Sequence, residues 1–152
     1  MEFIIENEIS EDTINQIYLI VKDYTKDYFT KDFPENMRID MQFQRAVLLK
    51  NSSEIISCIV FTSLDGSLHI TLMVTKRDYI NKGYGKLLMN HFVAHASELG
   101  INSIELFTFS QQTKPVNIST IKFYENVGFK IEREIKDLWG AGTIILKMRK
   151  SW

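Results

Sequence analysis

The residues best suited to chemistry lie between Thr75 and Lys86, where a predicted strand leads through a loop into a helix. Gly83 and Gly85 let the backbone approach a ligand closely, and Lys82 and Lys86 add positive charge. The first amide N–H groups of a helix have no acceptor within it, so this helix start can hold a phosphate or pyrophosphate. The alternative is an ordinary glycine turn, and the loop alone does not decide between the two.

Two nucleotide-binding motifs can be compared with this loop. The dinucleotide motif G-x-G-x-x-G requires glycine at the position of Leu88, after a strand of a parallel βαβ unit rather than a hairpin. Leu88 does not meet this requirement, although Glu105 lies at a suitable distance along the chain for a ribose contact. The phosphate-binding loop G-x-x-x-x-G-K-[ST] has no match either. A dinucleotide-dependent enzyme and nucleotide hydrolysis are therefore both disfavoured.

A second pattern runs from Asn117 to Phe129 and reads NISTIKFYENVGF. Together with Ile80-Asn81-Lys82-Gly83-Tyr84-Gly85, it resembles the GNAT superfamily of acyl-CoA-dependent N-acetyltransferases. That family carries [Q/R]-x-x-G-x-[G/A] between its fourth strand and third helix, and later an element close to N-x-x-A-x-x-[FL]-Y-E-x-x-G-F. Both motifs occur here in the family's order and at its separation, so the resemblance covers most of the chain.

The resemblance implies an acetyl-CoA site. The residues implied to contact the cofactor are Leu72, Met73 and Val74 along the pantetheine, Lys82, Gly83, Tyr84, Gly85 and Lys86 around the pyrophosphate, and Asn117 and Tyr124. Two positions depart from the family pattern. Ile80 replaces the usual Gln or Arg of the loop, and Val74 lies one residue further from Gly83 than is common. Backbone amides can still bind the pyrophosphate in spite of the first change.

Two of these residues have a second interpretation. Asn117 could cap the following helix as well as touch the cofactor. Tyr124 would be the general acid, because a positioned phenol can protonate the CoA thiolate that is expelled when an amine attacks a thioester. Ile121, Tyr124 and Val127 share one helix stripe, so Tyr124 would otherwise be a core aromatic residue. With the motif present, the catalytic interpretation is favoured.

The attacking amine must also lose a proton, since a primary amine with a pKa of about 10.4 is mostly protonated near neutral pH. His69 is the first candidate for the base, because it points from the polar face of a strand and titrates near neutrality. Glu105 on a later strand is the second candidate. Either side chain could instead serve packing or ion pairing on its sheet face.

Three further residues invite chemistry but carry weaker arguments. His91 and His95 are four residues apart on one predicted helix and could share a metal ion, but no third ligand is identifiable nearby. We therefore expect no metal. Cys58 is the only cysteine and lies within an apolar strand, so we expect a buried, inert thiol rather than a nucleophile.

The acceptor site should come from the segment Asp23 to Met41 and from the final hairpin near Trp139. The first segment interleaves aromatic and acidic residues: Tyr24, Tyr28, Phe29 and Phe33 with Asp23, Asp27, Asp32 and Glu35. Such a mixture could accept an aliphatic or cationic amine through carboxylates and aromatic faces. The alternative is an ordinary amphipathic helix with a solvated acidic side.

These residues need a scaffold, which hydrophobic periodicity and turn residues outline. The pattern predicts strands at 3–5, 43–50, 54–63, 68–74, 103–109, 129–137 and 143–149, helices from about 11 to 28, from 83 to 100 and from 117 to 127, and a loop or short helix at 29–41. Alternation in the strand 68–74 predicts one apolar face formed by Leu68, Ile70, Leu72 and Val74. The expected fold is α/β, a mixed, mostly antiparallel sheet flanked by helices.

Composition limits the classes of function. The 152 residues carry a formal net charge of -1 and form one predicted domain, residues 1–152, without linker or repeat. A nearly neutral chain offers no basic field for nucleic acid, and no apolar run approaches the roughly 20 residues of a membrane helix. The acidic N-terminus lacks a secretory pattern, so we expect a cytoplasmic protein.

The resemblance thus implies an N-acetyltransferase that transfers an acetyl group from acetyl-CoA to a primary amine of a small molecule or protein. Direct attack in a ternary complex is expected, with backbone N–H groups near Val74 stabilising the oxyanion. The alternative is a non-catalytic acyl-CoA-binding regulatory module with the same fold. A homodimer through the C-terminal strands is also implied by the resemblance.

Overall fold

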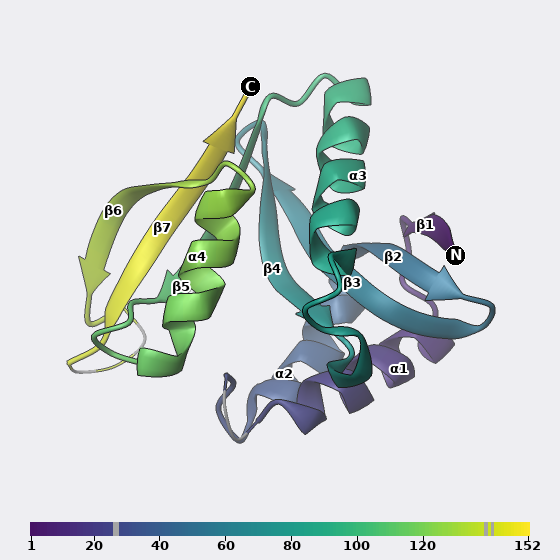
Figure 1. Cartoon of the computed structure of the whole chain (residues 1–152), viewed down its shortest axis with the longest axis horizontal. Helices are drawn as coiled ribbons and strands as arrows, with labels where there is room; N and C mark the ends of the chain where they lie inside the picture. Colours follow the sequence, from purple (N-terminus) through teal and green to yellow (C-terminus); the bar gives the residue numbers. More distant parts are fainter. Residues whose placement is uncertain (26–27, 139, 141) are drawn as a thin grey trace.

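The computed structural model describes residues 1–25, 28–138, 140 and 142–152 and has an α/β fold built on one seven-stranded sheet (Figure 1). The elements are β1 (Glu2–Glu6), α1 (Glu11–Asp23), α2 (Phe33–Asp40), β2 (Arg45–Asn51), β3 (Glu54–Leu64), β4 (Ser67–Thr75), α3 (Tyr84–Glu98), β5 (Ser103–Phe109), α4 (Ile118–Asn126), β6 (Lys130–Lys136) and β7 (Ile144–Ser151), with short 3₁₀ turns at Met41–Phe43, Arg77–Tyr79 and Pro115–Asn117. The strand order is β1-β2-β3-β4-β5-β7-β6. Only the β4–β5 pair is parallel among these neighbours, so the predicted mixed, mostly antiparallel sheet is confirmed.

Helices cover both faces of the sheet and create two apolar layers. Along β2, Val47 and Leu49 pack on the side of α3 and α4, whereas Ala46 and Leu48 pack on the side of α1 and α2. Alternate residues of a strand point to opposite faces, so a strand that is covered on both sides is apolar throughout. This explains the apolar run in β2 and the one in β3 from Ile55 to Phe61, which only the buried Ser57 interrupts.

Helix α1 ends earlier than the sequence predicts. Ser10 caps its start by accepting a hydrogen bond from the Thr13 amide at 3.2 Å, as the capping pattern indicated. The prediction that it extends to about Tyr28 is wrong, because the helix ends at Asp23. The Tyr24 ring is buried instead, and its hydroxyl donates to the Thr75 carbonyl of β4 at 2.7 Å. This tertiary contact turns the chain toward the sheet.

The predicted single apolar face of β4 is also wrong. Thr71 has no partner on β3, since the β3–β4 register shifts there by one residue. A β-bulge of this kind reverses which face the following side chains occupy. Leu68 and Ile70 therefore pack with α3 and α4, whereas Leu72 and Val74 pack with α1 and α2.

The feature that positions the site is the short contact between β4 and β5. They pair only from Leu68↔Ile104 to Ile70↔Leu106, although β4 continues to Thr75 and β5 to Phe109. Beyond these pairs the two strands separate, as the ribbon shows (Figure 1). We call this opening the splay. In the splay, the backbone N–H and C=O groups of each strand have no partner on the other strand.

Three further findings concern the described part of the chain. None of its helices is both long and apolar enough to cross a bilayer. Cys58 is buried, and desolvation raises the pKa of its thiol to about 12, so it stays protonated. His91 stacks on Phe3 with ring centroids 4.2 Å apart, which gives it a packing role at the surface.

Candidate active site

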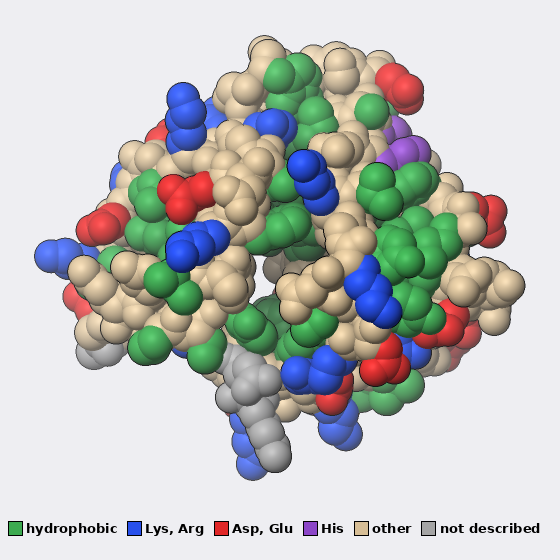
Figure 2. Space-filling view, viewed as in Figure 1, with side chains coloured by type: hydrophobic (Ala, Val, Ile, Leu, Met, Phe, Trp, Pro, Cys, Tyr) green, Lys and Arg blue, Asp and Glu red, His purple; other side chains and the backbone are tan. Residues whose placement is uncertain are grey.

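A cavity of about 900 Å³ occupies the splay. The space-filling view shows it as a hollow near the centre of the molecule (Figure 2). Both strands and three other segments line it: Ile70 to Thr75 of β4, Leu106 to Phe109 of β5, Tyr24 to Asn36 in part, Arg77, Ile80 and Asn81 before α3, and Val116 to Tyr124 in part. The volume lies in the range of pockets that hold small molecules or cofactors.

The backbone direction of β4 determines which groups face the splay. The Lys76 amide donates to the Ile56 carbonyl at 2.7 Å, so Lys76 points its backbone groups toward β3. Alternate residues in an antiparallel ladder point these groups in opposite directions. Met73 and Thr75 therefore direct their amides and carbonyls into the splay. The hydrogen bond from Tyr24 to the Thr75 carbonyl agrees with this direction.

The N-terminus of α3 lies next to the loop that reaches the cavity. Its first backbone hydrogen bond runs from Leu87 to the Gly83 carbonyl at 3.1 Å, which leaves the amides of Tyr84, Gly85 and Lys86 without acceptors in the helix. Gly83 has φ 84°, a left-handed conformation that glycine adopts most readily, and a Cβ built there meets no atom within 4 Å. These free amides and the open space fit a pyrophosphate.

Gly85 has a different reason to be glycine. A Cβ at this position would lie 3.4 Å from the Phe123 ring and 3.6 Å from the Met73 side chain. The residue therefore permits close approach of α3, α4 and β4. Lys82 and Lys86 are exposed beside this helix end, and the Lys82 ammonium lies 5.9 Å from the centre of the Tyr79 ring. Both cations are free to approach an anion by rotating flexible side chains.

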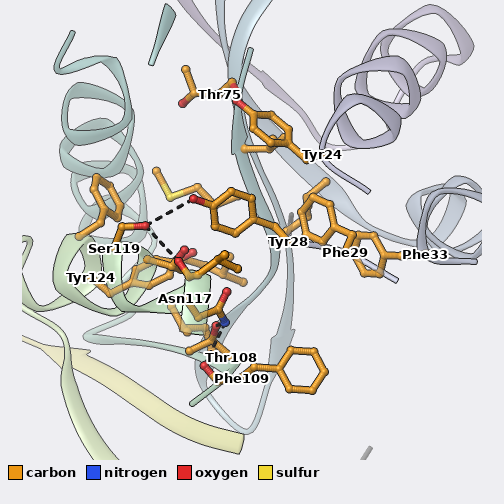
Figure 3. A pocket seen from close by; sticks show the side chains of 18 of the residues that line it. Tyr24, Tyr28, Phe29, Phe33, Thr75, Thr108, Phe109, Asn117, Ser119 and Tyr124 are labelled. Atoms are coloured by element: carbon orange, nitrogen blue, oxygen red, sulfur yellow. Dashed lines mark hydrogen bonds between the residues drawn. The ribbon is translucent and has the colours of Figure 1, made fainter. Parts of the chain in front are cut away.

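Asn117 connects α4 to β5 rather than capping its own helix. It occupies the N-cap position, but its side chain makes no capping hydrogen bond, so that interpretation is wrong. Its amide instead donates to the Thr108 hydroxyl at 3.1 Å and to the Phe109 carbonyl at 3.0 Å. The side chain is buried and holds the start of α4 against one wall of the cavity (Figure 3).

Tyr124 lies in the cavity wall on α4, with only 7% of its surface exposed (Figure 3). Its ring packs edge-on against Phe123 and Phe129, with centroids 5.4 Å away in each case. Its hydroxyl makes no hydrogen bond to any other residue in the described part of the chain. Burial raises the pKa of this phenol well above its ordinary value, so it remains a proton donor at physiological pH.

His69 and Glu105 lie together, but neither lines the cavity. They are partners across the parallel β4–β5 pairing, and the His69 Nδ1 lies 3.5 Å from a Glu105 carboxylate oxygen. Arg149 donates to the other carboxylate oxygen at 2.9 Å, and the Lys147 ammonium lies 3.4 Å from it. Both predicted bases thus belong to a charged cluster on the sheet face at the closed end of the splay.

Glu105 anchors this cluster electrostatically. Burial raises the pKa of its carboxyl, but the neighbouring Lys147 cation, the His69 ring and the Arg149 cation outweigh burial and hold that pKa below its ordinary value. A lowered pKa stabilises the fold above the unfolded-state pKa, and this contribution is lost as pH falls through the folded-state pKa.

We expect Glu105→Gln to lower the free energy of unfolding at pH 7 by about 1–3 kcal/mol, because two cations lose a charged partner. The difference from the wild type should begin to shrink as pH falls below the ordinary pKa of 4.5, and should shrink further as pH falls through the lower pKa of the folded carboxyl. Thermal unfolding of both proteins at pH 7, 4.5 and 3 measures this. If the variant and the wild type differ in stability by the same amount at all three pH values, the stabilisation by Glu105 is not electrostatic.

The sequence did not indicate several cavity residues. Phe107 and Phe109 line the cavity from β5, and Ser119 contributes a hydroxyl 3.4 Å from that of Tyr28 across the opening. The alternation of β5 could have placed both phenylalanines on one face. No sequence signal could have paired Tyr28 with Ser119, which lie 91 residues apart. Trp139, predicted to lie beside the acceptor site, is outside the described residues.

Comparison with known proteins adds independent information. The model of the acetyltransferase (GNAT) family matches residues 14–129. Among solved structures, a protein from Desulfovibrio desulfuricans assigned to the GNAT acetyltransferases superimposes with a TM-score of 0.82, at 13% identity over 99% of both chains. No curated protein matches the sequence significantly.

Two further solved structures have described activities. An aminoglycoside 6'-N-acetyltransferase in complex with coenzyme A gives a TM-score of 0.79, at 14% identity over 99% of this chain and 97% of the other. The ribosomal-protein-S18-alanine N-acetyltransferase from Escherichia coli gives 0.75, at 12% identity over 99% and 94%. At these identities the likeness establishes the shared fold.

Proposed function

The chain belongs to the GNAT acetyltransferase family, and from this premise we propose that it transfers an acetyl group from acetyl-CoA to a primary amine in a ternary complex. The observation that carries the proposal is the splay, which has a free helix N-terminus near one end and the Tyr124 hydroxyl in its wall. The structural neighbours that acetylate an aminoglycoside or a protein alanine support an amine acceptor, small molecule or protein.

The N-terminus of α3 would bind the pyrophosphate of acetyl-CoA through the amides of Tyr84, Gly85 and Lys86, with the open space beside Gly83 and the Lys82 ammonium. Leu72, Met73 and Val74 would extend along the pantetheine arm. The amide groups of the pantetheine arm can form hydrogen bonds with backbone groups of Met73 and Thr75 that face the splay. Ile80 lines the cavity as an apolar residue in place of the family's Gln or Arg, so the amides bear the anion-binding role.

The thioester supplies an activated acetyl group, and the protein supplies hydrogen bonds where charge develops. In this proposal, one backbone amide near Val74, that of Met73 or of Thr75, donates to the oxyanion that develops on the thioester carbonyl. Tyr124 donates its proton to the leaving thiolate sulfur. Asn117 fixes the start of α4, which carries Tyr124, and borders the arm of the cofactor.

The amine proton requires a separate route. His69 and Glu105 were the predicted bases, but they contact each other at the closed end of the splay and do not line the cavity. Among the described cavity residues there is no carboxylate or imidazole. We therefore propose that water in the open cavity carries this proton to solvent.

His69→Gln tests this route. We expect kcat/KM and its pH profile to stay within about twofold of the wild type, since removing a true general base costs about 10²–10⁴-fold. The measurement is kcat/KM for one accepted amine between pH 6 and 9. Loss of the acidic limb of the profile in the variant would instead identify His69 as the base.

The direct test of the function is release of CoA. The protein is incubated with acetyl-CoA and a panel of primary amines, and free thiol is followed with time. Amine-dependent thiol release with formation of the N-acetylated amine supports the proposal. If acetyl-CoA binds but no amine of any class stimulates release, the non-catalytic acyl-CoA-binding module is the better description.

The resemblance also implied a homodimer through the C-terminal strands, and we retain it as part of the proposal. Strand β6 forms one edge of the sheet, so its outer backbone groups are available for pairing with a second copy. Sedimentation equilibrium at micromolar concentration distinguishes a dimer from the 17.8 kDa monomer.

A further inference from the structure

One wall of the cavity is aromatic and comes from the segment that follows α1 and ends at the first residue of α2. It consists of Tyr24, Tyr28, Phe29 and Phe33, which we call the aromatic wall (Figure 3). Phe29 and Phe33 are stacked with centroids 4.5 Å apart, and Tyr24 and Tyr28 meet edge to face at 5.9 Å. The close-up shows this wall facing Ser119 and Tyr124 of α4 across the opening.

The acidic residues of this segment that the structure describes do not line the cavity, and Asp27 lies outside the described residues. Asp23 pairs with Arg77 at 2.9 Å, Glu35 accepts a hydrogen bond from Tyr18, and Asp32 does not line the cavity. No aspartate or glutamate occurs among the described residues that line it. The described residues therefore do not support an acceptor site made of carboxylates and aromatic faces together. They support only its aromatic component.

The aromatic wall does not form an open cation-binding cage. The Arg77 guanidinium already lies over the Tyr24 ring, 4.5 Å from its centre. Phe29 and Phe33 cover each other's facing surfaces, so they offer edges and outer faces to the cavity. Phe107 of β5 adds further apolar surface. Such a lining favours contact with a flat apolar group over attraction of several ammonium groups.

Charge leads to the same conclusion. Moving an ammonium group from water into a lining without carboxylates is costly unless a partner compensates for the lost hydration. A polyamine would bring several such groups, whereas a simple arylalkyl amine brings one. The apolar lining also lowers the pKa of that one bound ammonium, which favours the neutral nucleophile that must attack the thioester.

We propose that the acceptor is a primary amine carried on an aromatic group, which binds against the aromatic wall with its amine directed toward Tyr124. This inference rests on the proposed acetyltransferase function. A polycation or a peptide N-terminus would be a poorer substrate, because the described lining offers the first no carboxylate and includes the Arg77 cation, and the wall suits a single flat group better than a peptide backbone.

The test has two stages, so that failure of the function and failure of the acceptor assignment are distinguishable. Binding of acetyl-CoA is first measured by calorimetry. CoA release is then compared for 2-phenylethylamine, spermidine and a tetrapeptide with a free N-terminal alanine. We expect kcat/KM for 2-phenylethylamine to exceed the other two by about tenfold or more, the value of roughly one well-buried apolar contact.

Variants locate the effect. Phe29→Ala should lower kcat/KM for 2-phenylethylamine about tenfold, mainly through KM, while the affinity for acetyl-CoA stays the same. Phe29→Leu should recover part of the loss, and circular dichroism verifies that both variants fold. Phe43→Ala is the matched control, since this ring is 80% exposed and does not line the cavity, so its kinetics should equal those of the wild type.

Three outcomes overturn the inference. If acetyl-CoA binds and spermidine or the peptide is the better substrate, the acceptor assignment is wrong although the proposed function stands. The assignment also falls if 2-phenylethylamine is acetylated equally well by the wild type and Phe29→Ala. If acetyl-CoA does not bind and no amine releases CoA, the proposed function fails and the acceptor assignment fails with it.

Discussion

Tyr124→Phe is expected to lower kcat about 100-fold or more, because general acid catalysis contributes about 10²–10⁴-fold. The substitution removes one hydroxyl and retains the ring that packs against Phe123 and Phe129. That hydroxyl makes no hydrogen bond within the described part of the chain, so the fold loses none of those contacts. The affinity for acetyl-CoA and the melting temperature should therefore change little. Steady-state kinetics with the best amine measure the effect.

Tyr18→Phe provides the control for this experiment. Tyr18 also carries a hydroxyl and donates it to Glu35, but it lies outside the cavity. We expect its kcat to stay within about twofold of the wild type, as for most substitutions away from the chemistry. A Tyr124→Phe enzyme with nearly wild-type kcat would show that the leaving thiolate finds its proton elsewhere.

Gly83→Asp should weaken acetyl-CoA binding about 100-fold or more. A side chain is strained at the left-handed φ of 84°, but aspartate and asparagine adopt this region more readily than other residues, and circular dichroism verifies that the fold is preserved. A Cβ here meets no atom within 4 Å and the carboxylate would occupy the space proposed for the pyrophosphate. Two unit charges about 4 Å apart near a protein surface repel by about 4 kcal/mol, more than the roughly 2.7 kcal/mol of a 100-fold change.

Gly83→Asn separates charge from size, since asparagine has nearly the same shape and tolerates the same φ. The affinity of Gly83→Asn for acetyl-CoA should fall much less than that of Gly83→Asp. The difference in affinity between the two variants should become smaller at high salt. Calorimetric titration with acetyl-CoA at two salt concentrations measures both effects. Equal affinities for the two variants would place the pyrophosphate away from this helix end.

The sequence predicted the elements well where the pattern was local. The strand at 103–109 has the predicted limits. Gly83 and Gly100 lie just outside the two ends of α3, as the sequence predicted. The resemblance to the GNAT family rested on motifs separated by about thirty residues, and the family match over 14–129 confirms it. Local turn and capping chemistry determines such features, so a single sequence reveals them.

The errors arose where tertiary contacts override local pattern. Alternation along β4 could not reveal the bulge at Thr71, which depends on the register against β3. The end of α1 follows from the Tyr24 hydrogen bond to β4, a contact 51 residues away in sequence. His69 was predicted to face the chemistry, but the same bulge separates its face from that of Met73.

The acceptor segment shows the same limit in another way. Its alternating aromatic and acidic residues suggested a mixed site, because a helical or loop pattern alone does not say which side chains point inward. The fold turns Phe29 and Phe33 toward the cavity, whereas Asp23 and Glu35 find partners elsewhere. Burial favours this division, since apolar rings gain from leaving water and unpaired carboxylates lose.

The most direct test of the account is calorimetric titration of the wild-type protein with acetyl-CoA, with NADH as the control ligand. The account predicts saturable binding of acetyl-CoA at micromolar concentration and no binding of NADH, because the N-terminus of α3 and the splay suit a pyrophosphate with a pantetheine arm. No binding of acetyl-CoA would contradict the central claim, and the proposed activity would then have to be withdrawn.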